Sequence, residues 1–266
     1  MAKTYPVQSH EYNELVCTAG LRVDTNPYTL IRLYPIPFRQ LDRKSQYSKW
    51  EVIKVKIRKR KKDHRPESYG ADSDTIQRTG IKIGTRNGWS ERCSYLSSYL
   101  DQTDACTLLG NAKAHKTDAQ SLALVKPREI ITTSLDINPE YVQARKENPK
   151  REQVETLFGQ TLQSVWPSPV ILKYTYLCQS KHCRSHTQSV IDWEVQAAAY
   201  NQWQKFGPDE AVNFIRKKFI TDVCSSKKDL WFFVGNVHKR PADFMILSFF
   251  YPDRGVADIR QPTLCA

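Results

Sequence analysis

Residues 171–194 hold the densest group of metal-ligand side chains in the chain, within the sequence ILKYTYLCQSKHCRSHTQSVIDWE. Cys178, Cys183 and His186 follow an apolar run in a Cys-x4-Cys-x2-His pattern. Thiolate and imidazole are the ligands that zinc takes in tetrahedral structural sites. We therefore predict that Cys178, Cys183 and His186 bind a structural zinc ion.

A closed structural zinc site needs four ligands, and the spacing leaves the fourth open. His182 and Cys224 are the nearest candidates in the sequence. Four other cysteines qualify only if the fold brings them close, namely Cys17, Cys93, Cys106 and Cys265. The alternative interpretation is a turn with incidental thiols and a basic surface.

Residues 49–62 (KWEVIKVKIRKRKK) form the second informative stretch, because apolar and basic residues alternate from residue 53 onward. Successive side chains of a strand point to opposite faces, and every second one recurs after ~6.7 Å. One strand face would then carry Lys54, Lys56, Arg58, Arg60 and Lys62. We predict that this face contacts phosphates. The alternative is an edge strand whose lysines only prevent aggregation.

Two loops extend the basic character. Residues 63–69 (DHRPESY) form a polar turn, in which His64 and Arg65 are candidates for phosphate contact, although the segment could also be a plain connection. Residues 235–243 predict a hairpin loop with Lys239 and Arg240. The whole chain carries 40 Lys and Arg against 28 Asp and Glu, a net charge of +12 that favours a polyanionic partner.

Other classes of protein find little support. No apolar run reaches the ~20 residues of a membrane helix, and the first residues lack the apolar core of a signal peptide, so we expect a cytoplasmic protein without membrane contact. Seven scattered cysteines favour thiols or metal ligands over disulfides. The glycine-rich phosphate loops and the zinc-deaminase signature are absent from the sequence.

Asp192 and Glu194 are the best candidates for catalysis, as metal ligands of a nuclease. A helix over residues 189–203 would separate them by about 200° around its axis, too far apart to share one ion. We therefore expect Asp192 and Glu194 to cap the helix or to pair with cations such as Arg184, and Trp193 to join the core. A nuclease of the restriction type would carry a Glu-x-Lys pattern on a strand. Glu51 does not fit this pattern, because it lacks a lysine two positions further on. No catalytic residue is assigned.

The order of elements predicts an α+β protein. Residues 1–140 are expected to form a β-rich, barrel-like domain, residues 141–165 a charged connector, and residues 166–266 a smaller α+β domain around the Cys/His cluster. The last of these contains an apolar strand, two helices and two apolar strands at 230–234 and 244–251.

Several segments resemble the spaced motifs of an uncharacterised prokaryotic protein family: VCTAG (16–20), LIRLYPIPFR (30–39), KKDHRPESY (61–69), SLALVKPREI (121–130), and the Cys–Cys–His cluster with DWE (192–194). The amino-terminal part is also similar to domains built from paired oligonucleotide-binding (OB) barrels. That resemblance implies a small barrel that binds single strands through a basic face and stacked aromatic residues.

Together these features predict a protein that binds nucleic acid, either DNA or RNA, as an accessory subunit of a larger nucleoprotein machine with a protein partner, and they leave open whether it has a catalytic activity. The alternatives are a metal-dependent nuclease using Asp192 and Glu194, and a basic scaffold that meets an acidic protein.

Overall fold

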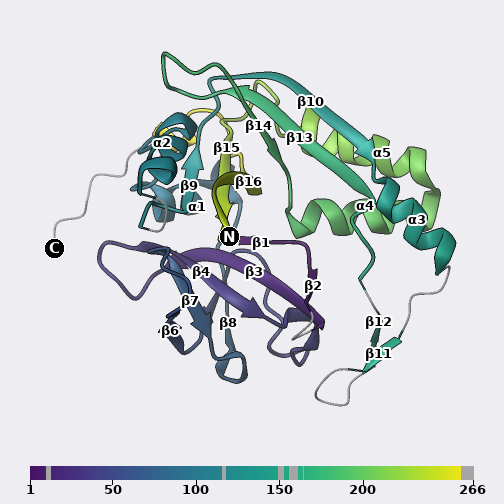
Figure 1. Cartoon of the computed structure of the whole chain (residues 1–266). Helices are drawn as coiled ribbons and strands as arrows, with labels where there is room; N and C mark the ends of the chain where they lie inside the picture. The colour runs from purple at the N-terminus through teal and green to yellow at the C-terminus, as the bar shows by residue number, and fades with distance from the viewer. Residues whose placement is uncertain (10–12, 116–117, 149–152, 156–160, 164, 259–266) are drawn as a thin grey trace.

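The computed structural model describes residues 1–9, 13–115, 118–148, 153–155, 161–163 and 165–258. A β-rich part, coloured purple to blue, lies below an α+β part in teal, green and yellow (Figure 1). The fold is therefore α+β, as the sequence predicts. No helix in these ranges is long and apolar enough to cross a membrane.

An open six-stranded sheet organises the first part. Its path runs β1-β3-β4-β7-β6, with β2 also paired to β3, and only the β4–β7 pair is parallel. The strands are β1 (Ala2–Lys3), β2 (Val7–Ser9), β3 (Asn13–Arg22), β4 (Thr29–Ile36), β6 (Ile57–Lys59) and β7 (Ser68–Ala71). Half of β4, the central strand, consists of buried apolar residues, namely Leu30, Ile31, Leu33 and Ile36, and Arg32 is buried between them.

A two-stranded sheet accompanies it, made of β5 (Glu51–Lys54) and β8 (Gln77–Lys82). The short 3-10 helices η1 (Phe38–Gln40) and η2 (Ser73–Thr75) flank these strands. Among the described residues the sheets stay open and no closed barrel forms. The reason is that β5 and β6 pair in different sheets, and no pairing connects the outer strands β6 and β1.

The alternation in residues 53–58 is present, but one continuous strand is not. Ile53, Val55 and Ile57 are partly buried and pack against a core of Val16, Ile31, Leu33, Ile36, Phe38, Tyr47 and Ile76. The chain leaves the strand conformation at residues 55–56 and changes sheets there. The predicted row of five cations on one strand is therefore interrupted.

Two three-stranded sheets build the second part. One has the order β16-β15-β9 and the other β10-β13-β14. A bridge between Val190 and Ile246 links the end of β14 to β16. The strands are β9 (Leu122–Val125), β10 (Glu129–Ile137), β13 (Val170–Leu177), β14 (His186–Ser189), β15 (Trp231–Val237) and β16 (Arg240–Phe250), with a separate hairpin of β11 (Gln153–Glu155) and β12 (Thr161–Gln163).

Helices pack around these sheets, and their ends follow recognisable capping signals. Asn138 accepts a hydrogen bond from the Glu140 amide at the start of α3, and Pro208 occupies the first position of α5. The helical elements are α1 (Arg86–Leu96), α2 (Ala105–His115), α3 (Pro139–Glu147), α4 (Trp193–Phe206), α5 (Pro208–Arg216), the π-helical turn η3 (Lys217–Thr221) and the 3-10 helix η4 (Val256–Asp258).

The two parts share one buried core. It joins residues of the first part to strands of the second: Ala2, Ala19, Leu30, Cys93, Leu96 and Leu100 pack with Leu122, Leu124, Trp231, Phe233, Leu247 and Phe250. β9 and β10 precede the predicted connector at 141–165, yet they pair with β15 and β13, which follow it.

Candidate metal centre and basic face

Four side chains gather where the β13–β14 hairpin meets α2. Cys106, Cys178, Cys183 and His186 each offer one ligand atom, and these atoms all lie within 4.8 Å of one another. The Cys106 Sγ is 3.2 Å from the His186 Nε2. The structure thus brings the three predicted ligands together and adds Cys106 as the fourth.

Local structure explains this convergence. Cys178 follows the last residue of β13, Cys183 lies in the turn of the hairpin, and His186 begins β14. The turn is held by a hydrogen bond that the Cys178 amide donates to the Cys183 Sγ, at 3.3 Å. Cys106 stands in the first turn of α2, which places its side chain beside the hairpin.

Burial shifts the pKa values of three of the four side chains in the cluster. Burial, followed by hydrogen bonding with the thiols of Cys178 and Cys183, raises the pKa of Cys106 to about 12. Burial also raises the pKa of Cys178 and lowers that of His186. Three such thiols become thiolates together only when a cation compensates their charge.

The donor set fits zinc well. Three thiolates and one imidazole are a known structural combination, with Zn–S distances of about 2.3 Å and Zn–N distances of about 2.0 Å. Ligand atoms already within 4.8 Å of one another need only a small contraction to reach that geometry. Four protein ligands would fill a tetrahedral coordination sphere, so the cluster is compatible with a structural zinc site.

The other candidates for the fourth ligand lie elsewhere. His182 and Cys224 are exposed and outside the cluster, and Cys93 is buried in the core shared by the two parts. Cys17 is on β3, beside Arg32. Cys265 is outside the described residues. Spacing alone could not identify Cys106, because it lies 72 residues before Cys178 and belongs to no local motif.

Asp192 and Glu194 converge on a lysine. Asp192 caps α4 by accepting a hydrogen bond from the Glu194 amide at 2.9 Å, as expected. Its other oxygen and the Glu194 Oε2 each lie 2.9 Å from the Nζ of Lys49, so the cation is Lys49 and not Arg184. Trp193 is half-buried and packs edge-on against Phe38. The ammonium group occupies the place between the carboxylates that a nuclease metal would require.

The predicted phosphate-binding residues fall into two groups by exposure. Lys54, Lys56, Arg58, Lys62 and His64 are exposed, together with the neighbouring Lys59 and Lys61, and so are Lys239 and Arg240. Arg60 is half-buried, with its guanidinium 5.3 Å from the ring centre of Tyr34. Arg65 is buried. We call the exposed cations the basic face: Lys54, Lys56, Arg58, Lys59, Lys61, Lys62, Lys239 and Arg240.

A buried polar network joins the two segments of the basic face. Arg65 forms two hydrogen bonds with the carboxylate of Asp63, at 2.9 and 2.8 Å, and one with the carbonyl oxygen of Asn236 on β15, at 2.9 Å. His238, in the β15–β16 turn, lies 3.3 Å from Asp63. Arg65 therefore holds the 238–240 turn beside residues 58–64, which is a structural role that its position in the sequence did not reveal.

Asp63 should make stability depend on acid pH. Burial opposes its charge, but hydrogen bonds from Arg65 and Ser68 outweigh this effect and hold its pKa well below the ordinary value. The contribution of the ionised Asp63 side chain to the free energy of unfolding is therefore complete above about pH 4. It is lost as the pH falls from there towards the folded-state pKa. We expect Asp63→Asn to lower the free energy of unfolding by about 3 to 5 kcal/mol at neutral pH.

Urea unfolding at neutral pH and below pH 4 measures this difference, which should shrink in acid because Asp63 of the unfolded chain takes up a proton there while the folded protein still holds it ionised. Asp243→Asn, which removes an exposed carboxylate on β16, is the matched control and should have little effect at either pH. A difference between wild type and Asp63→Asn that stays constant with pH would contradict the assignment.

Comparison with known families adds a classification but no activity. Residues 1–98 match one family model, described as a domain of unknown function (DUF8758), and residues 101–264 match a second, described as a domain of unknown function (DUF8757). The second match spans more than half of the chain, so the chain belongs to the DUF8757 family. No curated protein and no solved structure matches it. The two matches meet at residues 98–101, between α1 and α2.

Proposed function

We propose that the protein binds nucleic acid through the basic face. The observation that carries this proposal is that residues 63–65 and 236–238, more than 170 residues apart in the sequence, are held side by side by contacts of Asp63 and Arg65 with Asn236 and His238, and that exposed cations directly adjoin both segments, at 61–62 and 239–240. Backbone phosphates are the natural partner of such a surface, because each contact releases a counterion from the polyanion.

The charges of the basic face support this proposal because few of them are neutralised. Lys54, Lys56, Arg58, Lys61 and Lys62 have no ion-pair partner among the described residues. Arg240 pairs with Asp243, and Lys59 donates to the carbonyl oxygen of Pro66. The one acid within residues 54–65, Asp63, is buried and engaged by Arg65.

A structural zinc ion is the second element of the proposal. Cys106, Cys178, Cys183 and His186 would hold it and tie α2 to the β13–β14 hairpin, and the protein would act as an accessory subunit with a protein partner in a larger nucleoprotein machine. The ion supplies a rigid cross-link and no chemistry at a substrate.

The charge of the basic face can be tested by a triple substitution, Arg58→Gln/Lys61→Gln/Lys62→Gln. Each lost phosphate contact lowers the slope of log affinity against log salt by about 0.7 to 0.9, so the slope should fall by about 2 to 3. Binding should weaken alike for all base sequences. Fluorescence anisotropy with labelled single-stranded DNA, double-stranded DNA and RNA over a range of salt concentrations measures both quantities.

A matched control removes three exposed cations from another surface, Arg216→Gln/Lys217→Gln/Lys218→Gln. These lie at the end of α5 and in η3, on the side of the molecule away from β6 (Figure 1). Their loss changes the net charge equally but should leave the slope nearly unchanged. Equal effects of the two triple variants, or salt-independent binding, would contradict the proposal and favour a scaffold for an acidic protein.

A further inference from the structure

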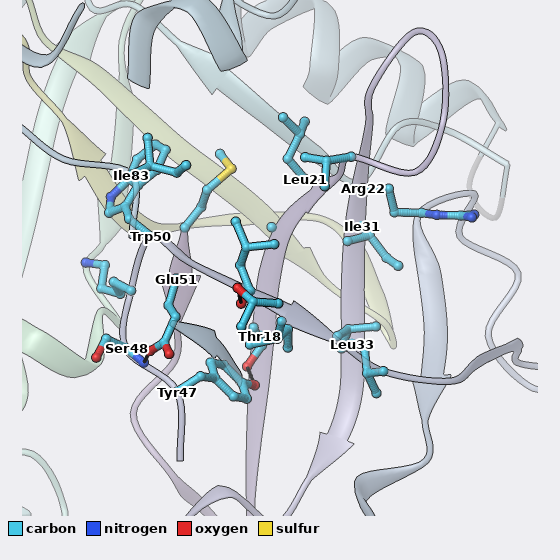
Figure 2. Close-up of a pocket in the computed structure, with 18 of the residues that line it drawn as sticks. Thr18, Leu21, Arg22, Ile31, Leu33, Tyr47, Ser48, Trp50, Glu51 and Ile83 are labelled. Carbon is cyan, nitrogen blue, oxygen red and sulfur yellow. Dashed lines mark hydrogen bonds between the residues drawn. The ribbon is translucent and has the colours of Figure 1, made fainter. Parts of the chain in front are cut away.

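A second candidate site lies in the β-rich part, where the apolar side chains of Ile53, Val55 and Ile57 contribute to its lining. It is a cavity of about 580 Å³ between the β3–β4 surface and the β5–β8 sheet. Figure 2 shows Leu21, Ile31 and Leu33 on one wall and Trp50 and Ile83 on the other. This volume is within the range of about 300 to 1,000 Å³ that is typical of small-molecule sites.

The walls of the cavity are mostly aliphatic. Ile31 and Leu33 project from one face of β4, while Ile53, Val55 and Ile57 approach from the opposite segment. Two further apolar residues in its lining remain open to solvent, since Ile81 is 58% exposed and Val23 is 43% exposed. Exposed large apolar side chains beside a cavity are typical of a ligand-binding groove.

The polar groups that line the cavity are already used by the protein. Thr18 and Tyr47 share a hydrogen bond of 2.8 Å. The carboxylate of Glu51 accepts from Arg78 at 2.6 Å and from the Ser48 amide at 2.9 Å. Three aromatic rings, of Tyr47, Trp50 and Tyr95, are in the lining, but aliphatic side chains outnumber them, and a nucleobase would also need free hydrogen-bonding groups. The interior therefore favours a hydrocarbon chain.

The charged side chains in the lining indicate the other end of the ligand. Arg22 is paired with Asp24, and Lys49 with Asp192 and Glu194. Lys3 donates to the Tyr47 carbonyl oxygen. Lys54 is the lining cation that has neither an ion pair nor a hydrogen bond in the described part of the chain, and it is exposed. An anionic group near Lys54 would complement this charge.

We propose that the cavity binds an anionic amphiphile of the fatty-acid class, with its hydrocarbon chain between β4 and β8 and its carboxylate at Lys54. This site is separate from the proposed nucleic-acid contact, although Lys54 borders both. Binding requires no covalent step. The free energy comes from removing the chain from water, so affinity must depend on chain length.

A homologous series tests the chain. Octanoate, decanoate and dodecanoate, below their micelle concentrations and without nucleic acid, are titrated into the full-length protein by isothermal calorimetry. Affinity should rise about fourfold for each added methylene, the fold-change that corresponds to about 0.8 kcal/mol, until the cavity is filled. Affinity that does not change with chain length would overturn the proposal.

Substitutions locate the site and the head group. Ile81→Glu should fold, because the residue is exposed, and should weaken decanoate binding by at least about tenfold. Ile131→Glu is the matched control, a 49% exposed isoleucine on β10, and should bind as wild type does. Lys54→Gln should remove the preference for decanoate over decanol, whereas Lys56→Gln should preserve it. Equal binding by Ile81→Glu and Ile131→Glu would overturn the proposal.

A second copy of the chain is the competing occupant of an open apolar groove. Sedimentation velocity distinguishes it, because the proposal expects a wild-type monomer. A wild-type dimer that Ile81→Glu converts to monomers would overturn the proposal and assign the groove to a protein interface.

Discussion

Replacing Cys106 by alanine should release zinc and destabilise the second half of the molecule. Three remaining ligands would leave one coordination position of the zinc ion open, and the ion would then dissociate more easily. Loss of a structural metal is one of the few changes that lower the free energy of unfolding by more than about 4 kcal/mol. For a chain of this size each kcal/mol moves the unfolding midpoint by about 2 to 4 °C, so a fall of about 10 °C is expected. Elemental analysis of the purified protein and a thermal melt measure the two effects.

Cys224→Ala is the matched control, since Cys224 is an exposed thiol outside the cluster. It should retain zinc in full and melt close to wild type. Wild-type protein that is folded but free of zinc when purified without chelators would refute the metal site. Full zinc content in Cys106→Ala would instead remove Cys106 from the ligand set and return the fourth position to another residue.

Replacing Lys49 by methionine should be nearly as severe. Its ammonium group is buried between Asp192 and Glu194, and despite the opposing effect of burial these two carboxylates raise its pKa. Methionine leaves the 1% exposed carboxylate of Asp192 without its cation, and breaking a buried ion pair in this way costs about 3 to 5 kcal/mol. The same contact joins the β-rich part to α4, so chemical denaturation should show a lower midpoint for the whole molecule.

The double variant Lys49→Met/Asp192→Asn separates charge from packing. With the buried carboxylate removed as well, part of the lost stability should return, giving a coupling energy between the two sites that a double-mutant cycle measures. Lys205→Met, an exposed lysine of α4, should have little effect. Additive losses without coupling would show that the Lys49–Asp192 contact contributes little.

The nuclease alternative predicts a different outcome for the same residues. If Asp192 and Glu194 bound a catalytic metal, removing Lys49 would improve access to it, and metal-dependent cleavage would increase. We expect no cleavage in either protein, because the carboxylates serve to fix α4 against the first part.

The sequence by itself determined the features that depend on neighbours along the chain. Cys178, Cys183 and His186 lie within nine residues, so one tight hairpin is enough to bring them together. Asp192 stands directly before a helical segment, and short polar side chains at that position cap helices. The alternation of residues 53–58 divides apolar from basic side chains because the period of a strand is two.

Only the tertiary structure decided which distant segments meet. Cys106 completes the cluster because α2 packs where the β13–β14 hairpin turns, and no spacing rule extends over that distance. Lys49 finds Asp192 and Glu194 through the shared core, while the break at residues 55–56 sends β5 and β6 into different sheets and leaves them open. The sequence suggested Arg65 as a surface cation, but the residue is buried and donates a hydrogen bond to the carbonyl oxygen of Asn236, so its role is structural. Long-range packing brings these partners together. The free energy of burying apolar surface depends on the area removed from water and not on how far apart the residues are in the sequence.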